Sequence, residues 1–353
     1  MLGEEINSFF KVWLTVLTSL CYCHAIGKIV PKGTKRLTFL LPLVCLFLFL
    51  PLKINSPHLG GLTAFFIVWL GNFKLLLFAF DRGPLNTHLS LPLFVTLACL
   101  PVKIQQNPSS KPQLNKGISS SSNVNYAVKG LLLGIILCAY DYVEFMHPVF
   151  IKLLYSLHIY FFLEIVLAIG AVVVRSFSGL ELEPQFNNPF LSTSLQDFWG
   201  KRWNLMVTSI LRPTVYEPTL RFWSSVIGRK WAPLPSVFST FVVSGVMHEL
   251  MFYYLGRVSP TGEVTWFFLI HGFCLTVEIG LKKAFREWWQ PPWVVTGPLT
   301  IGFVLGTGFW LFIPQFTRSK VDARSFEEYA ELGALLKSCS ERVLRVFGQS
   351  KRL

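Results

Sequence analysis

Nine apolar runs, separated by polar stretches, constrain the fold of this chain more than any other feature of its sequence. The runs lie at residues 6–26, 37–52, 59–79, 89–104, 126–146, 149–174, 234–257, 264–281 and 293–313. The longer ones have the roughly 20 residues that a helix needs to cross the hydrocarbon core of a bilayer. Only 14% of the residues are charged, whereas a soluble globular domain carries about 25%. The sequence therefore predicts an all-α, polytopic membrane protein.

Two of these runs are doubtful as membrane spans. Residues 37–52 are short and flanked by proline, and residues 89–104 contain Pro92 and Pro101, so either run could be re-entrant. We therefore expect eight or nine transmembrane helices. The chain shows no sustained internal repeat, so an inverted-repeat transporter architecture gains no support from the sequence.

The chain carries a net charge of +13, and its basic residues cluster between the apolar runs. The clusters are Lys28, Lys32, Lys35 and Arg36; Lys201 and Arg202; and Lys282, Lys283 and Arg286. Cytoplasmic loops beside membrane spans have this pattern, whereas a nucleic-acid binder gathers its charge on a polar domain, so we exclude nucleic acid as a partner. If residues 28–36, 175–233 and 282–292 are all cytosolic, one run before residue 125 cannot cross the membrane. We expect that run to be 89–104.

Composition divides the chain into four parts. Residues 1–104 hold the N-terminal transmembrane helices, 105–125 form a flexible polar loop, 126–317 form the catalytic transmembrane region, and 318–353 form a basic tail. The tail has eight basic and five acidic residues around a helical pattern, which indicates an interfacial or soluble helix. The seven cysteines show no spacing typical of a disulfide framework or a zinc site.

The first stretch that carries chemistry is Leu195–Leu211. Ser194 followed by Asp197 resembles a capping box, and Pro213 is expected to end the helix. The polar face of this helix would carry four residues: Asp197, Lys201, Asn204 and Thr208. Asp197 and Lys201 would form an ion pair one turn apart.

This pattern is typical of a helix that lies in the membrane interface, with Trp199 and Trp203 at headgroup depth. On that interpretation Asn204 is solvated and has no chemical role. The functional alternative is that the surrounding helices hold Asn204 near His248.

The second stretch is the apolar run Leu234–Gly256, which carries His248 just past its middle. A charged group at this depth costs roughly 2 kcal/mol or more. An imidazole is the side chain best suited to accept a proton near neutral pH, and apolar surroundings favour its neutral, basic form. We therefore predict a general base, with a histidine that hydrogen-bonds a neighbouring helix as the alternative. A metalloprotease is excluded, because Phe252 and not a second histidine lies four residues after His248.

Further ionisable residues lie in or beside the apolar runs: Asp141, Glu144, His158, Glu164, His271 and Glu278. His271 and Glu278 share one helix face, so they could line the same cavity or form an interhelical pair. Glu249 points about 100° away from His248 on the helix and is expected to orient a neighbouring group. The sequence has no glycine-rich phosphate loop, no G-x-S-x-G elbow and no metal-ligand cluster. It therefore predicts neither a covalent Ser or Cys mechanism nor a bound metal.

Three motifs in these stretches can be compared with known families: FWGKRWN (198–204), RPTVYEP (212–218) and SGVMHEL (244–250). Together they resemble the plant wax synthase family, which are long-chain-alcohol O-fatty-acyltransferases, and the related plant acyl-CoA:sterol O-acyltransferases. Both belong to the membrane-bound O-acyltransferases. The N-terminal LCYCHAIGKIVPKGTKRL (20–37) looks more like the sterol-acylating branch. The asparagine that ends the superfamily's F-Y-x-D-W-W-N motif aligns with Asn204, and its intramembrane histidine aligns with His248.

The resemblance implies a membrane-bound O-acyltransferase-like fold and a multi-pass protein of the endoplasmic reticulum membrane. It implies that His248 acts as general base on an acceptor hydroxyl, which attacks the thioester directly. Asn204 would donate a hydrogen bond to the thioester carbonyl or to the departing sulfur. One departure from the superfamily motif is that Gly200-Lys201-Arg202 stands where an acidic residue precedes the aromatic.

The substrates implied are acyl-CoA, as a co-substrate entering from the cytosolic side with no further cofactor, and a lipid alcohol arriving from the bilayer. Six residues are expected to contact them: Lys201, Arg202, Trp203, Arg212, Glu249 and His271. The basic ones would hold the phosphates and adenine of CoA. A sterol is the expected acceptor, with a long-chain fatty alcohol or a specialised terpenoid alcohol as alternatives. A transporter and a non-catalytic scaffold are the other classes, and the presence of both His248 and Asn204 disfavours the scaffold.

Overall fold

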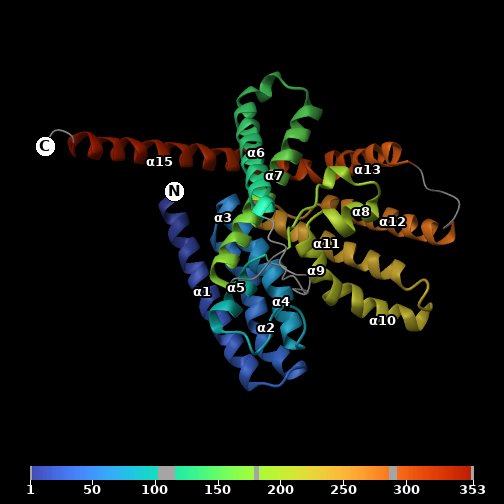
Figure 1. Ribbon diagram of the computed structural model, residues 1–353. Coiled ribbons are helices and arrows are strands. Elements are labelled where there is room, and N and C mark those ends of the chain that lie inside the picture. The colour runs from blue at the N-terminus through green and yellow to red at the C-terminus, as the bar shows by residue number, and fades with distance from the viewer. Residues whose placement is uncertain (1, 102–115, 179–182, 286–291, 351–353) are drawn as a thin grey trace.

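The computed structural model describes residues 2–101, 116–178, 183–285 and 292–350. Every regular element within these ranges is a helix, as the sequence predicts (Figure 1). The polar loop predicted at 105–125 lies partly outside the described residues. From Lys116 onward that stretch already belongs to a helix.

The N-terminal part folds into one bundle (Figure 1). Its helices are α1 (Leu2–Ile29), α2 (Thr34–Phe49), α3 (Pro57–Thr63), α4 (Asn72–Ala79) and α5 (Leu91–Cys99). A 3₁₀ turn, η1 (Leu50–Lys53), follows α2, and a π-helical segment, η2 (Ala64–Gly71), joins α3 to α4. The bundle is closed by a buried apolar core that includes Val16, Leu40 and Phe78.

The rest of the chain has longer helices linked by irregular turns. The elements are α6 (Lys116–Ala139), the 3₁₀ turn η3 (Tyr140–Phe145), α7 (Pro148–Ser178), the 3₁₀ turn η4 (Pro189–Leu191), α8 (Leu195–Asp197), η5 (Phe198–Arg202), α9 (Leu205–Leu211), η6 (Arg212–Tyr216), α10 (Glu217–Val226), α11 (Pro233–Gly256), α12 (Glu263–Ala284), α13 (Trp293–Thr307), η7 (Gly308–Phe312), α14 (Pro314–Arg318) and α15 (Val321–Ser350). The segments η5, η6 and η7 are π-helical.

Helix α11 lies between two apolar cores. Met247 and Met251 belong to the core of the N-terminal bundle, whereas Phe252 belongs to a second core with α12 and η7. The helices α11 and α12 pack closely because Gly245 has no side chain: a Cβ there would lie 3.2 Å from the Thr265 Cα. A glycine that permits close helix approach is a common device in membrane bundles. This packing fixes α11, and with it His248, at the centre of the molecule.

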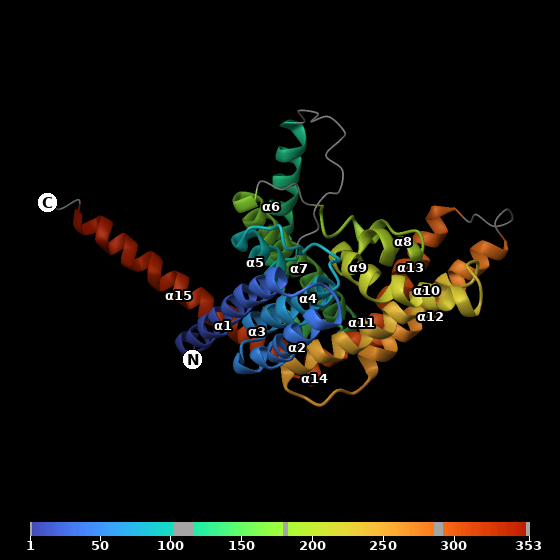
Figure 2. The same ribbon diagram turned by 90° about the horizontal axis from the view of Figure 1, so that it is seen from below.

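Helix α15 has two distinct parts. Its first turns contact α3 and α14, whereas its C-terminal part extends away from the other helices in both views (Figures 1 and 2). The chain begins this helix as soon as α14 ends, so the start of the predicted basic tail is built into the body of the protein.

Eight helical segments in the described part of the chain are long and apolar enough to cross a membrane. They correspond to eight of the nine apolar runs. The ninth, residues 89–104, forms only the nine-residue helix α5. The protein is therefore a multi-pass membrane protein, and 89–104 is the run that the charge pattern predicts not to cross.

A buried lysine holds the C-terminal end of the short helix α5. The Nζ of Lys74, in α4, donates hydrogen bonds to the carbonyl oxygens of Leu97 and Leu100, at 2.7 and 2.6 Å. These carbonyls lie at the C-terminal end of α5, where the backbone has no partner within the helix. An ammonium group is favoured there by the helix dipole as well as by the hydrogen bonds. Lys74 thereby caps the C-terminal end of α5 inside the protein.

The two ends of the N-terminal bundle are each held by an arginine. At one end Arg36 donates to the carbonyl oxygens of Gly27 and Phe78, both at 3.1 Å. At the other end Arg257 donates to the carbonyl oxygens of Pro51 and Ile54, both at 2.9 Å. Eight crossings in chain order place 28–36, 175–233 and 282–292 at the same end as Arg36. That end carries the basic loops, and its cytosolic orientation stays a prediction.

Candidate active site

One apolar cavity runs through the centre of the helices, with a volume of about 360 Å³. Ligand cavities in proteins usually have volumes of roughly 300–1,000 Å³. His248 and Asn204, which lie 44 positions apart in the chain, both line it. Three of the four π-helical segments, η2, η5 and η7, contribute to its wall through Trp69, Trp199 and Phe312. Such segments occur often at functional sites, because the extra residue redirects side chains.

His248 is held in one tautomer by its own helix. Its Nδ1 lies 2.8 Å from the carbonyl oxygen of Ser244. A carbonyl can only accept, so Nδ1 carries the proton and Nε2 of the neutral ring is left with a free lone pair. The ring stacks on Phe268 at a centroid distance of 4.2 Å and meets the edge of Trp69 at 4.7 Å. No other helix in the described ranges hydrogen-bonds this ring, so the geometry favours a base over an interhelical link.

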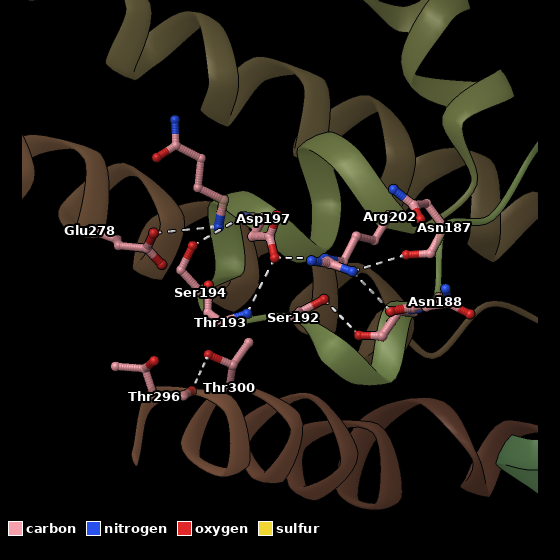
Figure 3. Close-up of polar contacts among 12 residues, drawn as sticks. Asn187, Asn188, Ser192, Thr193, Ser194, Asp197, Arg202, Glu278, Thr296 and Thr300 are labelled. Carbon is pink, nitrogen blue, oxygen red and sulfur yellow. Dashed lines mark hydrogen bonds and ion pairs between the residues drawn. The ribbon is translucent and has the colours of Figure 1, made fainter. Parts of the chain in front are cut away.

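The segment before Asn204 starts as predicted and then departs from a regular α-helix. The Ser194 Oγ accepts the Asp197 backbone N–H at 3.1 Å, which confirms the helix start. The predicted ion pair of Asp197 with Lys201 is wrong. Asp197 instead pairs with Arg202 at 2.6 Å (Figure 3). In the π-helical segment η5 the backbone hydrogen bonds join residues five apart, and Arg202 lies five residues after Asp197.

Asn204 interrupts the helix that was predicted to run through Leu195–Leu211. Its backbone is left-handed, with φ 40° and ψ 64°, and it caps the next helix, α9. Asparagine tolerates this conformation better than most residues. The Asn204 Oδ1 accepts the Val207 backbone N–H at 3.4 Å, so the side-chain NH₂ remains available to donate towards the cavity. A solvated Asn204 on an interfacial helix is therefore not what the structure has.

The chain also continues past Pro213, which was predicted to end the helix. The five residues of η6 make a π-helical turn that contains this proline and leads directly into α10. A π-helical turn accommodates a proline because fewer backbone amides need an α-helical partner. The prediction of a stop at Pro213 is wrong, and the register shifts there instead.

Both predicted interfacial tryptophans line the cavity. Trp203 lines the cavity and stacks on Phe198, with ring centroids 5.4 Å apart. Trp199 also lines the cavity, and its indole N–H donates to His271 Nδ1 at 3.1 Å. The break at Asn204 turns this segment inward, and its aromatic side chains follow.

His271 lies behind the wall of the cavity and positions Trp199. Its side chain is fully buried. Since Nδ1 accepts from Trp199, Nε2 carries the proton and donates to Thr307 Oγ1 at 2.8 Å, and Thr307 in turn donates to the Phe303 carbonyl at 2.7 Å. His271 is not among the residues that line the cavity in the part of the chain that the structure describes. A direct contact of His271 with substrate, as the sequence suggested, has no support in this arrangement.

Trp199→Phe and His271→Leu are each expected to lower kcat about tenfold, the effect of one lost buried hydrogen bond. The double variant should lose no more than the worse of the two single variants, because both changes remove the same bond. The measurement is kcat and KM for all three variants. Additive losses, or losses that appear only as reduced protein yield, would contradict a positioning role.

The two nearby carboxylates cap helices and lie outside the cavity wall. Glu249 Oε1 accepts the Thr265 backbone N–H at 3.1 Å, in the first turn of α12. Glu278 Oε2 accepts the Leu195 backbone N–H at 2.9 Å, at the start of α8. Negative charge is favoured at a helix N-terminus. Glu249 thus orients a neighbour, as its direction on the helix suggested, whereas its expected contact with substrate has no support in this arrangement. His271 and Glu278 share a face but do not share the cavity.

The three basic residues predicted to bind CoA differ in their surroundings. Arg202 is committed to the fold: besides Asp197 it contacts the carbonyl oxygens of Asn187 and Asn188, at 3.3 and 3.4 Å (Figure 3). Lys201 is exposed. Arg212 is exposed and lies 3.8 Å from a Glu217 carboxylate oxygen. Lys201 and Arg212 are therefore the two free to meet a ligand at the surface.

Several cavity residues have no signal in the sequence. Trp69 lies in an apolar run of the N-terminal bundle, and Phe326 lies in the tail, yet both line the cavity beside residues of α7 and α13. Their roles depend on tertiary packing between segments far apart in the chain. Only the histidine and asparagine stand out by type and setting.

A histidine with a free Nε2 lone pair and an asparagine both line one apolar cavity within a bundle of apolar helices, an arrangement that fits an enzyme acting on a lipid. Comparison with known proteins identifies its class. Residues 182–270 match the model of the membrane bound O-acyl transferase family. The chain is 50% identical over 331 residues, 93% of its length and 95% of the relative's, to acyl-CoA–sterol O-acyltransferase 1 of Arabidopsis thaliana.

A second relative is the long-chain-alcohol O-fatty-acyltransferase of Simmondsia chinensis, 45% identical over 92% of this chain and 94% of that protein. A third is the probable long-chain-alcohol O-fatty-acyltransferase 3 of Arabidopsis thaliana, 43% identical over 88% of this chain and 90% of that protein. This chain belongs to the membrane-bound O-acyltransferase family. It is an acyl-CoA-dependent O-acyltransferase.

Proposed function

We propose that the protein transfers a fatty acyl group from acyl-CoA to the hydroxyl of a sterol and so forms a sterol ester. The observation that carries the chemistry is the single cavity lined by both His248 and Asn204. The sterol acceptor is supported by the 50% identity to the sterol acyltransferase and by the N-terminal sequence at 20–37. The endoplasmic reticulum membrane is the proposed location, which co-localisation of a tagged protein with a marker of that membrane tests.

In the proposed reaction His248 moves the proton and Asn204 stabilises the developing negative charge. His248 Nε2 takes the proton of the acceptor hydroxyl as its oxygen attacks the thioester carbonyl carbon, and a C–O bond forms. The negative charge that develops on the carbonyl oxygen accepts a hydrogen bond from the Asn204 side-chain NH₂. The C–S bond then breaks, and the imidazolium returns its proton to the departing sulfur, which gives the ester and free CoA thiol. The Nδ1–H bond to Ser244, 2.8 Å long, keeps the ring oriented throughout.

The second candidate acceptor is a long-chain fatty alcohol. It is favoured by the number of relatives whose names describe long-chain-alcohol acyltransferases. Expression in yeast that lacks its own ester-forming enzymes, with labelled acyl-CoA and both acceptors supplied in competition, separates the two. A predominant wax ester would overturn the sterol assignment, and no ester from either acceptor would overturn the proposed function.

Lys201→Glu is expected to raise the KM for acyl-CoA a few-fold with little change in kcat, because a surface ion pair contributes roughly 0.2–1 kcal/mol. Salt should reduce the difference from the wild type, since screening weakens exposed charge pairs. The measurement is KM at low and high ionic strength. Lys35→Glu is the matched control, since Lys35 is also exposed but lies in the first turn of α2. An equal effect of both variants would contradict a local contact of CoA with Lys201.

A further inference from the structure

The cavity continues from His248 to a second end with a different character. Its wall follows α11 past Met251 to Leu255, which is seven residues, or about 10 Å along a helix axis. At that level Leu255 packs against Gly61 of α3, where a Cβ would lie 2.6 Å from the Leu255 Cδ2. The far end is therefore formed where α3, α7 and the first turns of α15 meet.

Polar side chains gather at this far end. The His58 ring donates through Nδ1 to Glu328 Oε2 at 2.5 Å, and Tyr155 OH donates to Asp322 Oδ2 at 3.1 Å. Around them His158 lies between Tyr140 OH and Tyr329 OH, at 3.1 and 3.0 Å. Burial opposes ionisation of Glu328, but the hydrogen bonds from His58 and Ser56 hold the pKa of its carboxyl below the ordinary value. Glu328 is therefore a carboxylate that fixes the proton of His58 on Nδ1.

The hydrogen bonds of His58 and Asp322 leave further polar atoms of these side chains without a partner. His58, Asp322 and Ser325 all line the cavity. The His58 Nε2, the second carboxylate oxygen of Asp322 and the Ser325 Oγ have no hydrogen-bond partner among the described residues. Polar atoms in an apolar setting cost free energy unless a ligand or water satisfies them. A sterol or a simple fatty alcohol has one hydroxyl, which reacts at His248, so it offers nothing to this end.

We propose that this far end is a second polar subsite, which binds an oxygen function at the distal end of a bifunctional acceptor such as a diol. The reactive hydroxyl lies at His248, the hydrocarbon body fills the apolar middle of the cavity, and the distal hydroxyl hydrogen-bonds His58, Asp322 or Ser325. The proposal rests on the acyltransfer function proposed above and adds to it the class of acceptor. It makes α15, the start of the C-terminal tail, part of acceptor recognition.

The test compares α,ω-diols of increasing length with the primary alcohols of the same carbon number, using microsomes that contain the full-length protein. The wild-type ratio of kcat/KM for diol over alcohol, counted per hydroxyl group, should exceed one and peak at one length. Ser325→Ala and Asp322→Asn should lower that ratio about tenfold, the effect of one hydrogen bond. Asn at 322 can still accept from Tyr155, so the surrounding contact is kept.

Ser156→Ala is the matched control. Ser156 lines the same cavity, but its hydroxyl already donates to the Lys152 carbonyl at 2.9 Å, so its loss should not change the ratio. A wild-type ratio at or below one for every length overturns the subsite, and so does a ratio that survives both variants. Ester from primary alcohols without any preference for diols removes the subsite alone. Absence of ester from every acceptor removes the proposed function as well.

Discussion

His248→Asn is expected to leave a folded protein whose ester synthesis falls about 10²- to 10⁴-fold, the contribution of general-base assistance. The amide of asparagine can replace the Nδ1–H that donates to the Ser244 carbonyl at 2.8 Å. It cannot replace Nε2, the ring nitrogen that takes the proton. The variant therefore separates the loss of the base from the loss of a local hydrogen bond. The measurement is ester formed per amount of protein in microsomes given labelled acyl-CoA.

His147→Asn is the matched control for this change. His147 is exposed and accepts the Val149 backbone N–H through Nδ1 at 3.3 Å, which an asparagine side chain can also do. It should keep the wild-type rate. Ester synthesis above a tenth of the wild-type rate by His248→Asn would show that Nε2 is not the base.

Asn204→Asp is expected to lower turnover about 10²- to 10³-fold, the usual effect of losing one donor to a developing oxyanion. Aspartate keeps the oxygen that accepts from Val207 and tolerates the left-handed backbone of φ 40°. What it loses is the NH₂ donor, and it adds a negative charge beside the carbonyl that becomes negative. Protein accumulation should be unchanged, and kcat is the quantity to measure.

The backbone at Asn204 decides which substitutions are informative. Alanine removes the cap, at a cost of about 1 kcal/mol, and strains a left-handed position by roughly 1–2 kcal/mol. Poor accumulation of Asn204→Ala would therefore not distinguish folding from catalysis. Asn204→Gly keeps the conformation and costs only a few tenths of a kcal/mol as a cap. Wild-type activity of both the Asp and the Gly variants would mean that Asn204 is a cap and nothing more.

Hydropathy and charge were enough to predict the membrane fold. The apolar runs match the eight helical segments long enough to span a membrane, and 89–104, which the basic loops single out as the run that does not cross, holds only the nine-residue helix α5 in its described residues. Both signals act locally, through length and through the sign of flanking charge. Pro101, which follows the extended Leu100, is a local signal for the end of α5, whereas the hydrogen bonds of Lys74 to the carbonyls at that end required the tertiary structure.

The candidate site was predictable at its two chemically unusual residues and at Trp203, which also lines the cavity. His248 and Asn204 stand out by type, and the structure brings them to one cavity. The arrangement between Ser194 and Pro213 was not predictable, because a pattern read at 3.6 residues per turn cannot detect π-helical turns. For the same reason Arg202 replaced Lys201 as the partner of Asp197.

The contacts of His271 and Glu278 could also not be predicted from the sequence. Spacing placed His271 and Glu278 on one face of α12, but their functions depend on which groups of other elements approach that face. His271 meets the indole of Trp199, and Glu278 meets the backbone of Leu195. Side chains that contact other side chains across the fold carry no periodic signal along the chain.

The hydrogen bonds from Lys74 to the end of α5 have a consequence for the order in which the helices assemble. The run at 89–104 is apolar, yet the charge pattern predicts that it does not cross the membrane. The carbonyl oxygens of Leu97 and Leu100 accept hydrogen bonds from the side chain of Lys74, at 2.7 and 2.6 Å. Lys74 belongs to an earlier span, so α5 can adopt this packing only after that span has formed. The spans that follow, including the one that carries the proposed base His248, are synthesised after both partners of this contact.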